Sequence, residues 1–574
     1  MAHGFPIAIQ GFREAKEMPI FWRPLGSLDI ASDPHVLPES QVDGTVVSEA
    51  IARIKNLRLN VHGQAILRLG SREAGVAMLT NPANFIIEQD GMRYSFDGSN
   101  IYRNEVVISG GASSQWWAIL YNQFNDSDQQ VFALNGALRK RINGADVFEW
   151  GIEPPMAPPA LVALGTGLTG TYNVVYTYAR FVGGTVVSES NPSPAATEAL
   201  TVANEGIKVT FTASSDPQVT HVRIYRTLDG GGIFYFDQNV PTGSTTVTST
   251  QGDGALGGEV ARNHDRPPLG TIVIGPTYDG VAFIAVGHKL YWCLPRQPEY
   301  WPALNFIEVG VPQFPIRAMV MMDGLVYCLT DDAIWMNQGL GDGFNPIRLT
   351  GISRTTPNAY SAVPVQGVGL FHVSLDGIYL YRGVRDQKIS EQTVDPIFRG
   401  ESKGGIPIFE GSSSWVHHFG NKVYLHWGDG NLLVFTVDTE KLSYYKYDER
   451  LSAPALDRKN GRFLVGDNTR RIRAIEEDGL GDDLGTAIEW DIETKQFGSS
   501  VFRTRFEWVK YDVNATDATG VKGELFYDGA LHQTHTIVGN RETGFRVIKR
   551  GNTRLCSIRL SGTGKAFIHS IAID

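Results

Sequence analysis

One pattern of apolar and polar positions recurs through the middle of the chain. A turn with a glycine leads into a run of alternating β-branched and aromatic residues, and the copies start at Gly287, Gly324, Gly377, Gly420 and Gly461. Glycine supplies the positive φ that tight hairpins require, and the alternation matches a strand with one buried face. The copies lie roughly 40 to 50 residues apart, a period typical of four-stranded β-propeller blades, whose ring buries the faces that a lone hairpin exposes.

The first 153 residues carry weaker signals of the same kind. Apolar positions spaced by three and four predict a short helix over residues 46–54. Hairpin-like stretches around Gly91, Gly98 and Gly136 resemble the later repeats in length and turn composition. We therefore expect residues 1–153 to form an extended N-terminal segment and the first propeller blades.

Two breaks divide the rest of the chain. Stacked prolines at 154–159 mark a stiff boundary. Residues 154–262 are predicted to form an inserted β-sandwich, whose order of strands and turns resembles a fibronectin type III domain. The propeller resumes over residues 263–482 and ends in a glycine-rich linker at 479–485. Residues 483–574 predict a C-terminal β-sandwich of jelly-roll type, so the expected fold class is all-β.

The composition describes a folded chain of several domains. It has 574 residues, of which 42% are hydrophobic and 20% charged, and this length exceeds one ordinary core. No apolar run of about 18 residues is present, so no membrane span is expected. The start lacks the basic and apolar regions of a signal peptide. Cys293, Cys328 and Cys556 have neither metal-type nor disulfide spacing, which favours a reducing cytoplasm.

The net charge bears on the class of partner. A charge of −10 argues against a protein that grips nucleic acid over a broad basic face. It is compatible with a wall along which DNA moves without sticking, and equally with plain solubility.

Two glycine-rich motifs imitate nucleotide-binding loops. Gly165–Gly170 matches the dinucleotide fingerprint letter for letter, but a strand pattern follows it where a helix is needed, so a turn at the entry of the sandwich is favoured. Gly562–Lys565 lacks both the leading glycine and the hydroxyl residue of a phosphate loop, and we expect a hairpin turn there.

Candidate metal ligands are few. Four histidines lie in neighbouring repeats, at His372, His417, His418 and His426. Two adjacent strand residues point to opposite faces, so at most one of His417 and His418 joins His426, and no zinc site is expected. The carboxylates at Asp478, Asp482 and Asp483 miss the spacing of a calcium loop, and a solvated linker is favoured.

The aromatic-rich segment Tyr291–Phe306 offers a sugar platform as one interpretation. A strand and a blade-edge loop packed by tryptophan is the favoured alternative. A glycosidase pair of carboxylates is not excluded, although no pair stands out. We therefore predict no catalytic, cofactor-binding or metal-binding residues.

Three stretches resemble virion proteins of tailed bacteriophages. They are Tyr291–Gly310, Phe371–Gly383 and the run from Leu28 through Asn56 to Gly70. Together they resemble the tail hub or nozzle family (tail tubular protein B-like) of short-tailed phages. The resemblance covers most of the chain outside the inserted sandwich.

The resemblance implies a structural role without catalysis. It implies a homohexamer around a central channel, seated below the portal-adaptor ring, with tail fibres or spikes on its outer face. The viral DNA would pass through the channel without sequence-specific binding, and the protein would be assembled in the host cytoplasm into the virion tail. Two other classes stay open: a secreted or virion-associated propeller enzyme acting on carbohydrate, and a glycan-binding adhesin.

Overall fold

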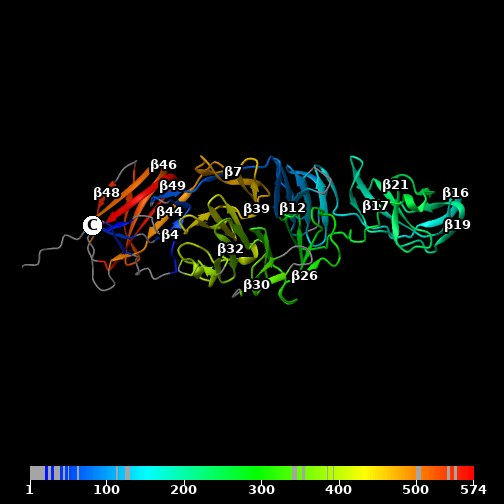
Figure 1. The fold of residues 1–574 in the computed structure, drawn as a ribbon. Coiled ribbons are helices and arrows are strands. Elements are labelled where there is room, and N and C mark those ends of the chain that lie inside the picture. The colour runs from blue at the N-terminus through cyan, green and yellow to red at the C-terminus, as the bar shows by residue number, and fades with distance from the viewer. Residues whose placement is uncertain are drawn as a thin grey trace, which may run out of the picture.

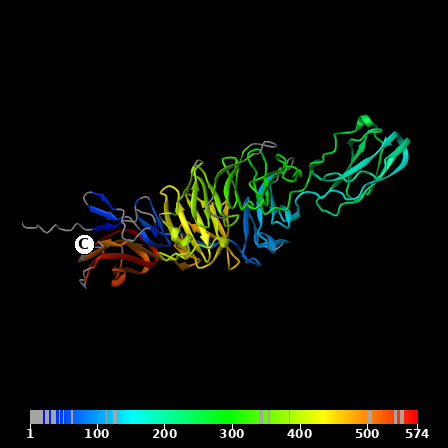
Figure 2. The same cartoon turned by 90° about the horizontal axis from the view of Figure 1, so that it is seen from below.

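The computed structural model shows an all-β chain arranged as three parts in a row (Figure 1). The structure describes residues 20–22, 28–31, 39–42, 45–48, 51–60, 62, 64–111, 114–122, 129–338, 345–351, 356–383, 385–391, 393–498, 506–538, 543–547 and 553–573. A ring of small sheets forms the middle of the row. A sandwich extends from one side of it, and a domain built from both ends of the chain lies on the other, as Figure 2 also shows.

The ring has seven blades of four antiparallel strands each, counted over the described residues. Blade one is β8 (Phe85–Gln89), β9 (Met92–Phe96), β10 (Asn100–Arg103) and β11 (Val106–Gly110). Blade two is β12 (Trp117–Asn122), β13 (Gln129–Leu134), β14 (Arg139–Asn143) and β15 (Asp146–Glu149). Blade three is β23 (Ile272–Ile274), β24 (Phe283–Val286), β25 (Lys289–Trp292) and β26 (Phe306–Glu308).

The remaining blades follow in chain order. Blade four is β27 (Ala318–Met322), β28 (Leu325–Leu329), β29 (Ala333–Gln338) and β30 (Asn345–Gly351). Blade five is β31 (Ala362–Val365), β32 (Gly369–Ser374), β33 (Gly377–Tyr381) and β34 (Asp386–Lys388). Blade six is β35 (Trp415–Phe419), β36 (Lys422–Trp427), β37 (Asn431–Thr436) and β38 (Lys441–Lys446). Short helices lie between blades five and six, at α1 (Asp395–Phe398) and η3 (Gly411–Ser413).

The seventh blade closes the ring with a strand from the start of the chain. Its first three strands are β39 (Leu451–Asp457), β40 (Arg462–Asp467) and β41 (Ile472–Glu477), and its fourth is β7 (Gly70–Glu73), antiparallel to β41. The short strands β42 (Asp482–Asp483) and β43 (Thr486–Ala487) extend this sheet, so the linker predicted at 479–485 is partly wrong. The innermost strands contact one another in the order β8, β12, β23, β27, β31, β35, β39 and back to β8. This is the arrangement of a β-propeller.

The recurring glycine pattern marks hairpins of these blades. Gly324, Gly420 and Gly461 lie between the first and second strands of their blades, whereas Gly287 lies between the second and third strands and Gly377 begins the third. The pattern therefore identifies blade hairpins without fixing one position in the blade.

The inserted sandwich lies between blades two and three. Its strands are β16 (Ala160–Tyr172), β17 (Val174–Val182), β18 (Thr185–Glu189), β19 (Leu200–Thr210), β20 (His221–Thr227), β21 (Phe234–Pro241) and β22 (Thr246–Ser249), followed by η1 (Asp253–Ala255). They form one sheet in the order β16-β19-β22 and another in the order β18-β17-β20-β21. A shared apolar core, including Tyr176, Ile207 and Ile224, lies between the two sheets.

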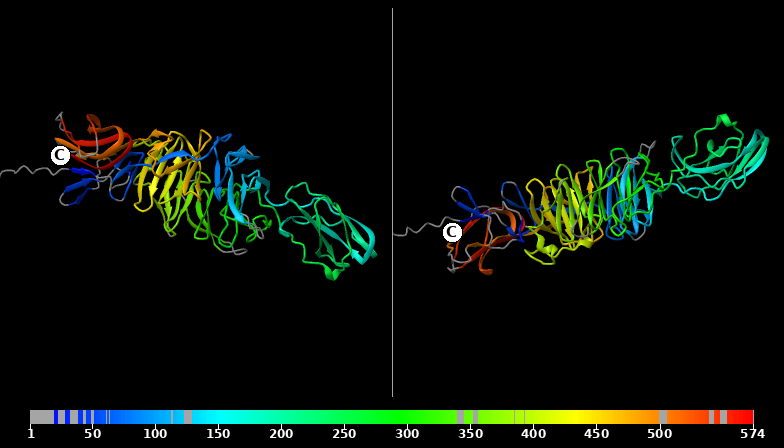
Figure 3. Two further views of the ribbon diagram at one scale, coloured as in Figure 1. Left: turned by 90° about the horizontal axis from the view of Figure 1, so that it is seen from above. Right: turned by 60° about the horizontal axis from the view of Figure 1, so that its bottom comes forward.

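The third part combines the two ends of the chain, which lie side by side in all views (Figure 3). Its N-terminal strands are β1 (Ile20–Trp22), β2 (Glu39–Val42), β3 (Thr45–Ser48), β4 (Ile51–Lys55), β5 (Leu57–Leu59) and β6 (Ala65–Leu67). Its C-terminal strands are β44 (Glu489–Thr494), β45 (Phe497–Gly498), β46 (Trp508–Tyr527), β47 (Ala530–Thr536), β48 (Thr543–Arg546) and β49 (Leu555–Ile573). The long strands β46 and β49 pair along most of their length.

Two local predictions fail in this part. The helix predicted over residues 46–54 is wrong, because the described residues there belong to β3 and β4, which pair with β2 and β44. Pairing with a distant strand overrides the local helical spacing. The hairpin turn predicted at Gly562–Lys565 is also wrong, since these residues lie inside β49.

One apolar cluster joins this part to the propeller. It includes Trp490 and Ile558 of the third part together with Phe371, Trp427 and Phe435 of blades five and six. In the described residues, no helix is long and apolar enough to cross a membrane.

Candidate functional site

One end of the propeller channel is spanned by side chains. Tyr360, just before β31, stacks on Trp117 of β12, with ring centroids 4.6 Å apart. Its hydroxyl donates to the Asn84 carbonyl at 2.8 Å and accepts from Gln115 Nε2 at 2.8 Å. In the ring β31 lies between β27 and β35, so Tyr360 reaches across to blades one and two. These contacts join blade five to blades one and two across the ring, at the N-terminal ends of the inner strands.

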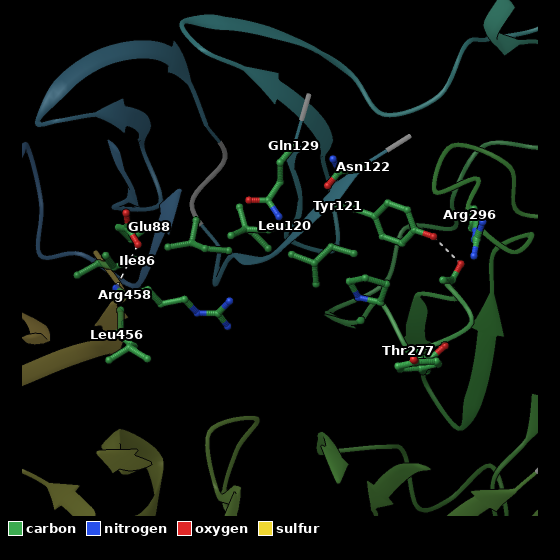
Figure 4. Close-up of a pocket in the computed structure, with 18 residues that line it drawn as sticks. Ile86, Glu88, Leu120, Tyr121, Asn122, Gln129, Thr277, Arg296, Leu456 and Arg458 are labelled. Carbon is green, nitrogen blue, oxygen red and sulfur yellow. Dashed lines mark hydrogen bonds between the residues drawn. The ribbon is translucent and has the colours of Figure 1, made fainter. Parts of the chain in front are cut away.

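A cavity of about 840 Å³ lies beside the inner strands of blades one, two and seven (Figure 4). Its wall comes from the C-terminal halves of β8, β12 and β39 and from the turn after β23. Tyr121, Arg296 and Arg458 are among its lining residues. The Tyr121 hydroxyl donates to the Gly280 carbonyl. Burial, the largest influence, raises the pKa of Tyr121 above its usual value, so this hydroxyl stays a donor at neutral pH.

Glu88 holds the cavity wall in place. Its carboxylate is buried and accepts hydrogen bonds from the backbone N–H of Gly91 and, at 3.2 Å, of Arg458. The bond from Arg458 ties β8 of the first blade to the end of β39 in the seventh. The backbone of Arg458 is therefore fixed while its exposed side chain extends into the cavity.

A second buried polar cluster fixes the inserted sandwich to the propeller. Glu299, in the loop after β25, has no exposed side-chain surface and accepts from Arg180 at 2.7 Å and from Ser188 at 2.5 Å. Both donors belong to the sandwich. Arg141 of blade two lies 3.4 Å from the same carboxylate and donates to Gln218 of the sandwich at 3.0 Å. We call these five residues the sandwich junction.

A third cluster joins the third part to the propeller. The buried guanidinium of Arg68 pairs with Asp483, donates to the Asn56 amide oxygen at 3.0 Å and lies 3.9 Å above the Tyr447 ring. Asn56 in turn accepts from the Lys446 backbone N–H at 2.7 Å. These residues, which we call the closure cluster, link the N-terminal segment to the outer strand of blade six and to β42.

The four candidate histidines do not converge. His372 bonds Asp386 at 3.0 Å, His417 stacks on Phe463, and His426 stacks on Trp415. His418 follows His417 in β35 and is paired with Val423 of β36. No group of three His, Cys, Asp or Glu side chains that could hold a metal ion is found in the described part of the chain.

The nucleotide-like and calcium-like motifs have structural surroundings. Gly165–Gly170 lies within β16, where the register shifts, rather than at a turn before it. Gly170 has a φ of +144°, and a Cβ there would lie 2.5 Å from Asp229 Cγ, so close approach explains the glycine. Asp483 pairs with Arg68 instead of lying in a solvated linker.

The aromatic segment Tyr291–Phe306 serves packing and the junction. Trp301 is buried and lies edge-on to Trp150, with ring centroids 5.8 Å apart. Glu299 of the same segment is the centre of the sandwich junction. Glu299 was not among the predicted site residues, although a lone carboxylate among aromatic residues was an available signal. No local motif marks Arg68, Tyr360 or Arg458.

The three cysteines are buried. Burial raises the pKa of Cys293 and of Cys328 to about 12. Both thiols are therefore protonated at neutral pH and act as packing groups rather than nucleophiles.

Removing the Tyr360 hydroxyl is expected to have a small effect. Tyr360→Phe keeps the stack on Trp117 and loses the hydrogen bonds to Asn84 and Gln115, which should lower the free energy of unfolding by about 1 kcal/mol. Thermal unfolding measures the change. Tyr278→Phe is the matched control, because Tyr278 is fully exposed and its removal should change nothing. Equal effects of the two variants would show that the hydrogen bonds of Tyr360 do not stabilise the fold.

The buried His426 predicts acid sensitivity. Its Nε2 accepts from the Leu451 N–H at 3.2 Å, and burial lowers the pKa of His426 to about 3 from an ordinary value of 6.5. Below pH 6.5 the unfolded chain takes up a proton that the folded chain does not. As the pH falls below 6.5, this group should therefore lower the free energy of unfolding by about 1.4 kcal/mol per pH unit. Above that pH, the contribution of His426 to stability is fully present.

Unfolding measured at several pH values between about 7.5 and about 4 tests this. His426→Gln should flatten the slope by that amount whatever its own cost, whereas His62→Gln at an exposed position should leave the slope unchanged. An unchanged slope in His426→Gln would rule out the assignment.

Comparisons with known proteins give distant structural likenesses. No family model and no curated protein sequence matches the chain. The computationally designed Ika8 protein aligns with a TM-score of 0.33 and 9% identity over 70% of this chain and 98% of its own. BamB from Moraxella catarrhalis aligns with a TM-score of 0.31 and 9% identity over 72% of this chain and 98% of its own. Glutaminyl cyclase from Myxococcus xanthus aligns with a TM-score of 0.20 and 13% identity over 34% of this chain and 84% of its own.

Proposed function

We propose that the chain is a structural protein of a bacteriophage virion, the tail hub or nozzle of a short tail. It forms a homohexameric ring below the portal-adaptor. The genome leaves through the lumen between the copies, and tail fibres or spikes attach to the outer face. The proposal starts from the resemblance carried by Tyr291–Gly310, Phe371–Gly383 and Leu28–Gly70.

One structural observation carries the proposal: both joins between the three parts contain buried ion pairs. Domains joined in one chain move relative to each other unless their interface prevents it. Here Glu299 bonds the sandwich to the propeller, and Arg68 bonds the propeller to the third part. A closed symmetric ring requires every copy to present the same surfaces at the same angles. Rigid joins support that requirement.

The propeller channel itself is not the proposed path of the genome. The stack of Trp117 and Tyr360 spans that channel at one end. The proposal therefore places DNA between copies, where a net charge of −10 on each copy favours passage without sticking.

We also infer the classes of the two flanking parts. The insertion has seven strands in sheets of three and four around one core, which supports a fibronectin type III-like sandwich. The long paired strands β46 and β49 support a jelly-roll-like C-terminal part that the N-terminal strands complete.

Native mass spectrometry and negative-stain microscopy of the full chain test the proposal. The protein is examined alone and mixed with the portal-adaptor ring. We expect six copies in a ring with a central hole, on its own or on the adaptor. A persistent monomer that never joins a ring overturns the proposal, and hydrolysis of a polysaccharide by that monomer would point to the carbohydrate-active class. Trimers with glycan affinity would point to an adhesin.

A further inference from the structure

The cavity of about 840 Å³ is formed by residues of blades one, two, three and seven of the propeller. Its volume lies in the range of pockets that hold a small molecule, about 300–1,000 Å³.

The charges on the pocket wall favour an anion. Its lining residues include two cations, Arg296 and Arg458, and one carboxylate, Glu88. Both oxygens of Glu88 already accept backbone N–H bonds, from Gly91 and Arg458. Across the described ranges, neither guanidinium forms an ion pair with a carboxylate, whereas the propeller residues Arg93, Arg317, Arg382 and Arg473 each do. Among the described residues that line the pocket, two are cations and one is a carboxylate.

The geometry presents one of these cations to the cavity. Figure 4 shows the Arg458 side chain extending from the end of β39 toward the middle of the pocket. Its backbone is held by Glu88, so the guanidinium starts from a fixed base. A guanidinium offers a planar fork of N–H donors that matches carboxylate and phosphate groups.

The rest of the wall suits the body of a small organic ligand. Ile86, Leu120 and Leu456 add apolar surface, and the ring of Tyr121 lies on the opposite wall from Arg458. Apolar walls with a few placed polar groups are the usual composition of small-molecule sites.

We propose that the propeller pocket binds a small organic anion, a molecule bearing a carboxylate or a phosphate group, with Arg458 as the principal anion-binding residue. Arg296 adds positive charge at the wall, and the volume of the cavity suits a ligand of small-molecule size. This site goes beyond the proposed role in a tail and does not depend on the formation of a hexamer.

Titration calorimetry on the full-length protein tests the site. The probes are citrate and glucuronate for carboxylates, glucose 6-phosphate and inorganic phosphate for phosphates, and glucose as the neutral control. We expect at least one anion to bind with a Kd below about 1 mM. Arg458→Gln should weaken that binding about tenfold or more, because the charge-assisted hydrogen bonds are lost.

The matched control is Arg317→Gln, an exposed arginine whose guanidinium pairs with Asp331 instead of facing the cavity. It should leave the Kd unchanged. Binding of only the carboxylates or only the phosphates supports the site and identifies the group. The proposal is overturned if no anion binds, if only glucose binds, or if Arg458→Gln binds as tightly as the parent chain. The thermal unfolding of Arg458→Gln should match that of the parent, since its backbone N–H is retained.

Discussion

Glu299→Ala is expected to lower the free energy of unfolding by about 3–5 kcal/mol, because it leaves the buried guanidiniums of Arg141 and Arg180 without their shared carboxylate. The side chains of Glu299, Arg141 and Arg180 are 0%, 2% and 8% exposed, so water does not replace the lost partner. The effect should concentrate at the sandwich junction. The sandwich should then move relative to the propeller before either of them unfolds.

Small-angle scattering and limited proteolysis measure that movement, and thermal unfolding measures the stability. We expect a broader distribution of molecular dimensions and faster cleavage within 153–159. Glu153→Ala is the control, because Glu153 is largely exposed and its pair with Arg266 lies at the surface. Surface pairs of this kind contribute about 0–1 kcal/mol. If Glu299→Ala behaves like Glu153→Ala in both measurements, the junction does not hold the sandwich.

Arg68→Ala is expected to lower the free energy of unfolding by a similar amount, about 3–5 kcal/mol. The guanidinium is wholly buried, and its removal leaves several hydrogen-bond acceptors without a donor. It donates to Asn56, to the Leu69 carbonyl at 3.0 Å and to the Lys446 carbonyl at 3.3 Å, besides its pair with Asp483. Because the closure cluster lies beside β7, we expect the loss to open the seventh blade.

Hydrogen exchange of β7 and β41, followed with the unfolding midpoint, measures this opening. Arg72→Ala on β7 is the matched control. Its side chain is 46% exposed and pairs with Glu477, so a change of about 0–1 kcal/mol is expected. The loss of stability in Arg68→Lys should lie between those of Arg68→Ala and Arg72→Ala, because an ammonium lacks the planar fork of N–H donors. Equal exchange rates of β7 and β41 in Arg68→Ala and Arg72→Ala would contradict a role of Arg68 in closing the ring.

The sequence predicts local features of this fold better than its closure. Glycine turns with alternating strands predicted the hairpins at Gly324 and Gly420, because both signals act within a few residues. The same signal appears at Gly287 and Gly377 in the other hairpin of the blade, so spacing alone did not give the number of blades. The fourth strand of the last blade, β7, lies several hundred residues before its partner. No local pattern encodes that pairing.

The buried polar clusters were not predicted from the sequence, for a related reason. Glu299, Arg180 and Arg141 come from three separate regions and become partners only when the sandwich folds against blade two. A carboxylate on a predicted loop looks solvated until the chain around it is placed. The same holds for Asp483, which the glycine-rich sequence around it made resemble a linker.

The placement of β7 also orders the synthesis of the protein. The propeller cannot complete its ring until β41, with residue Glu477, has left the ribosome and met a strand made near the beginning of translation. The sandwich has no such delay, since β16 to β22 pair only with one another. Blades one and two, by contrast, are made early, and blade one lacks its neighbour until blade seven has been made. Nascent chains stalled within blade six should therefore carry a protease-resistant sandwich and a protease-sensitive, unclosed propeller.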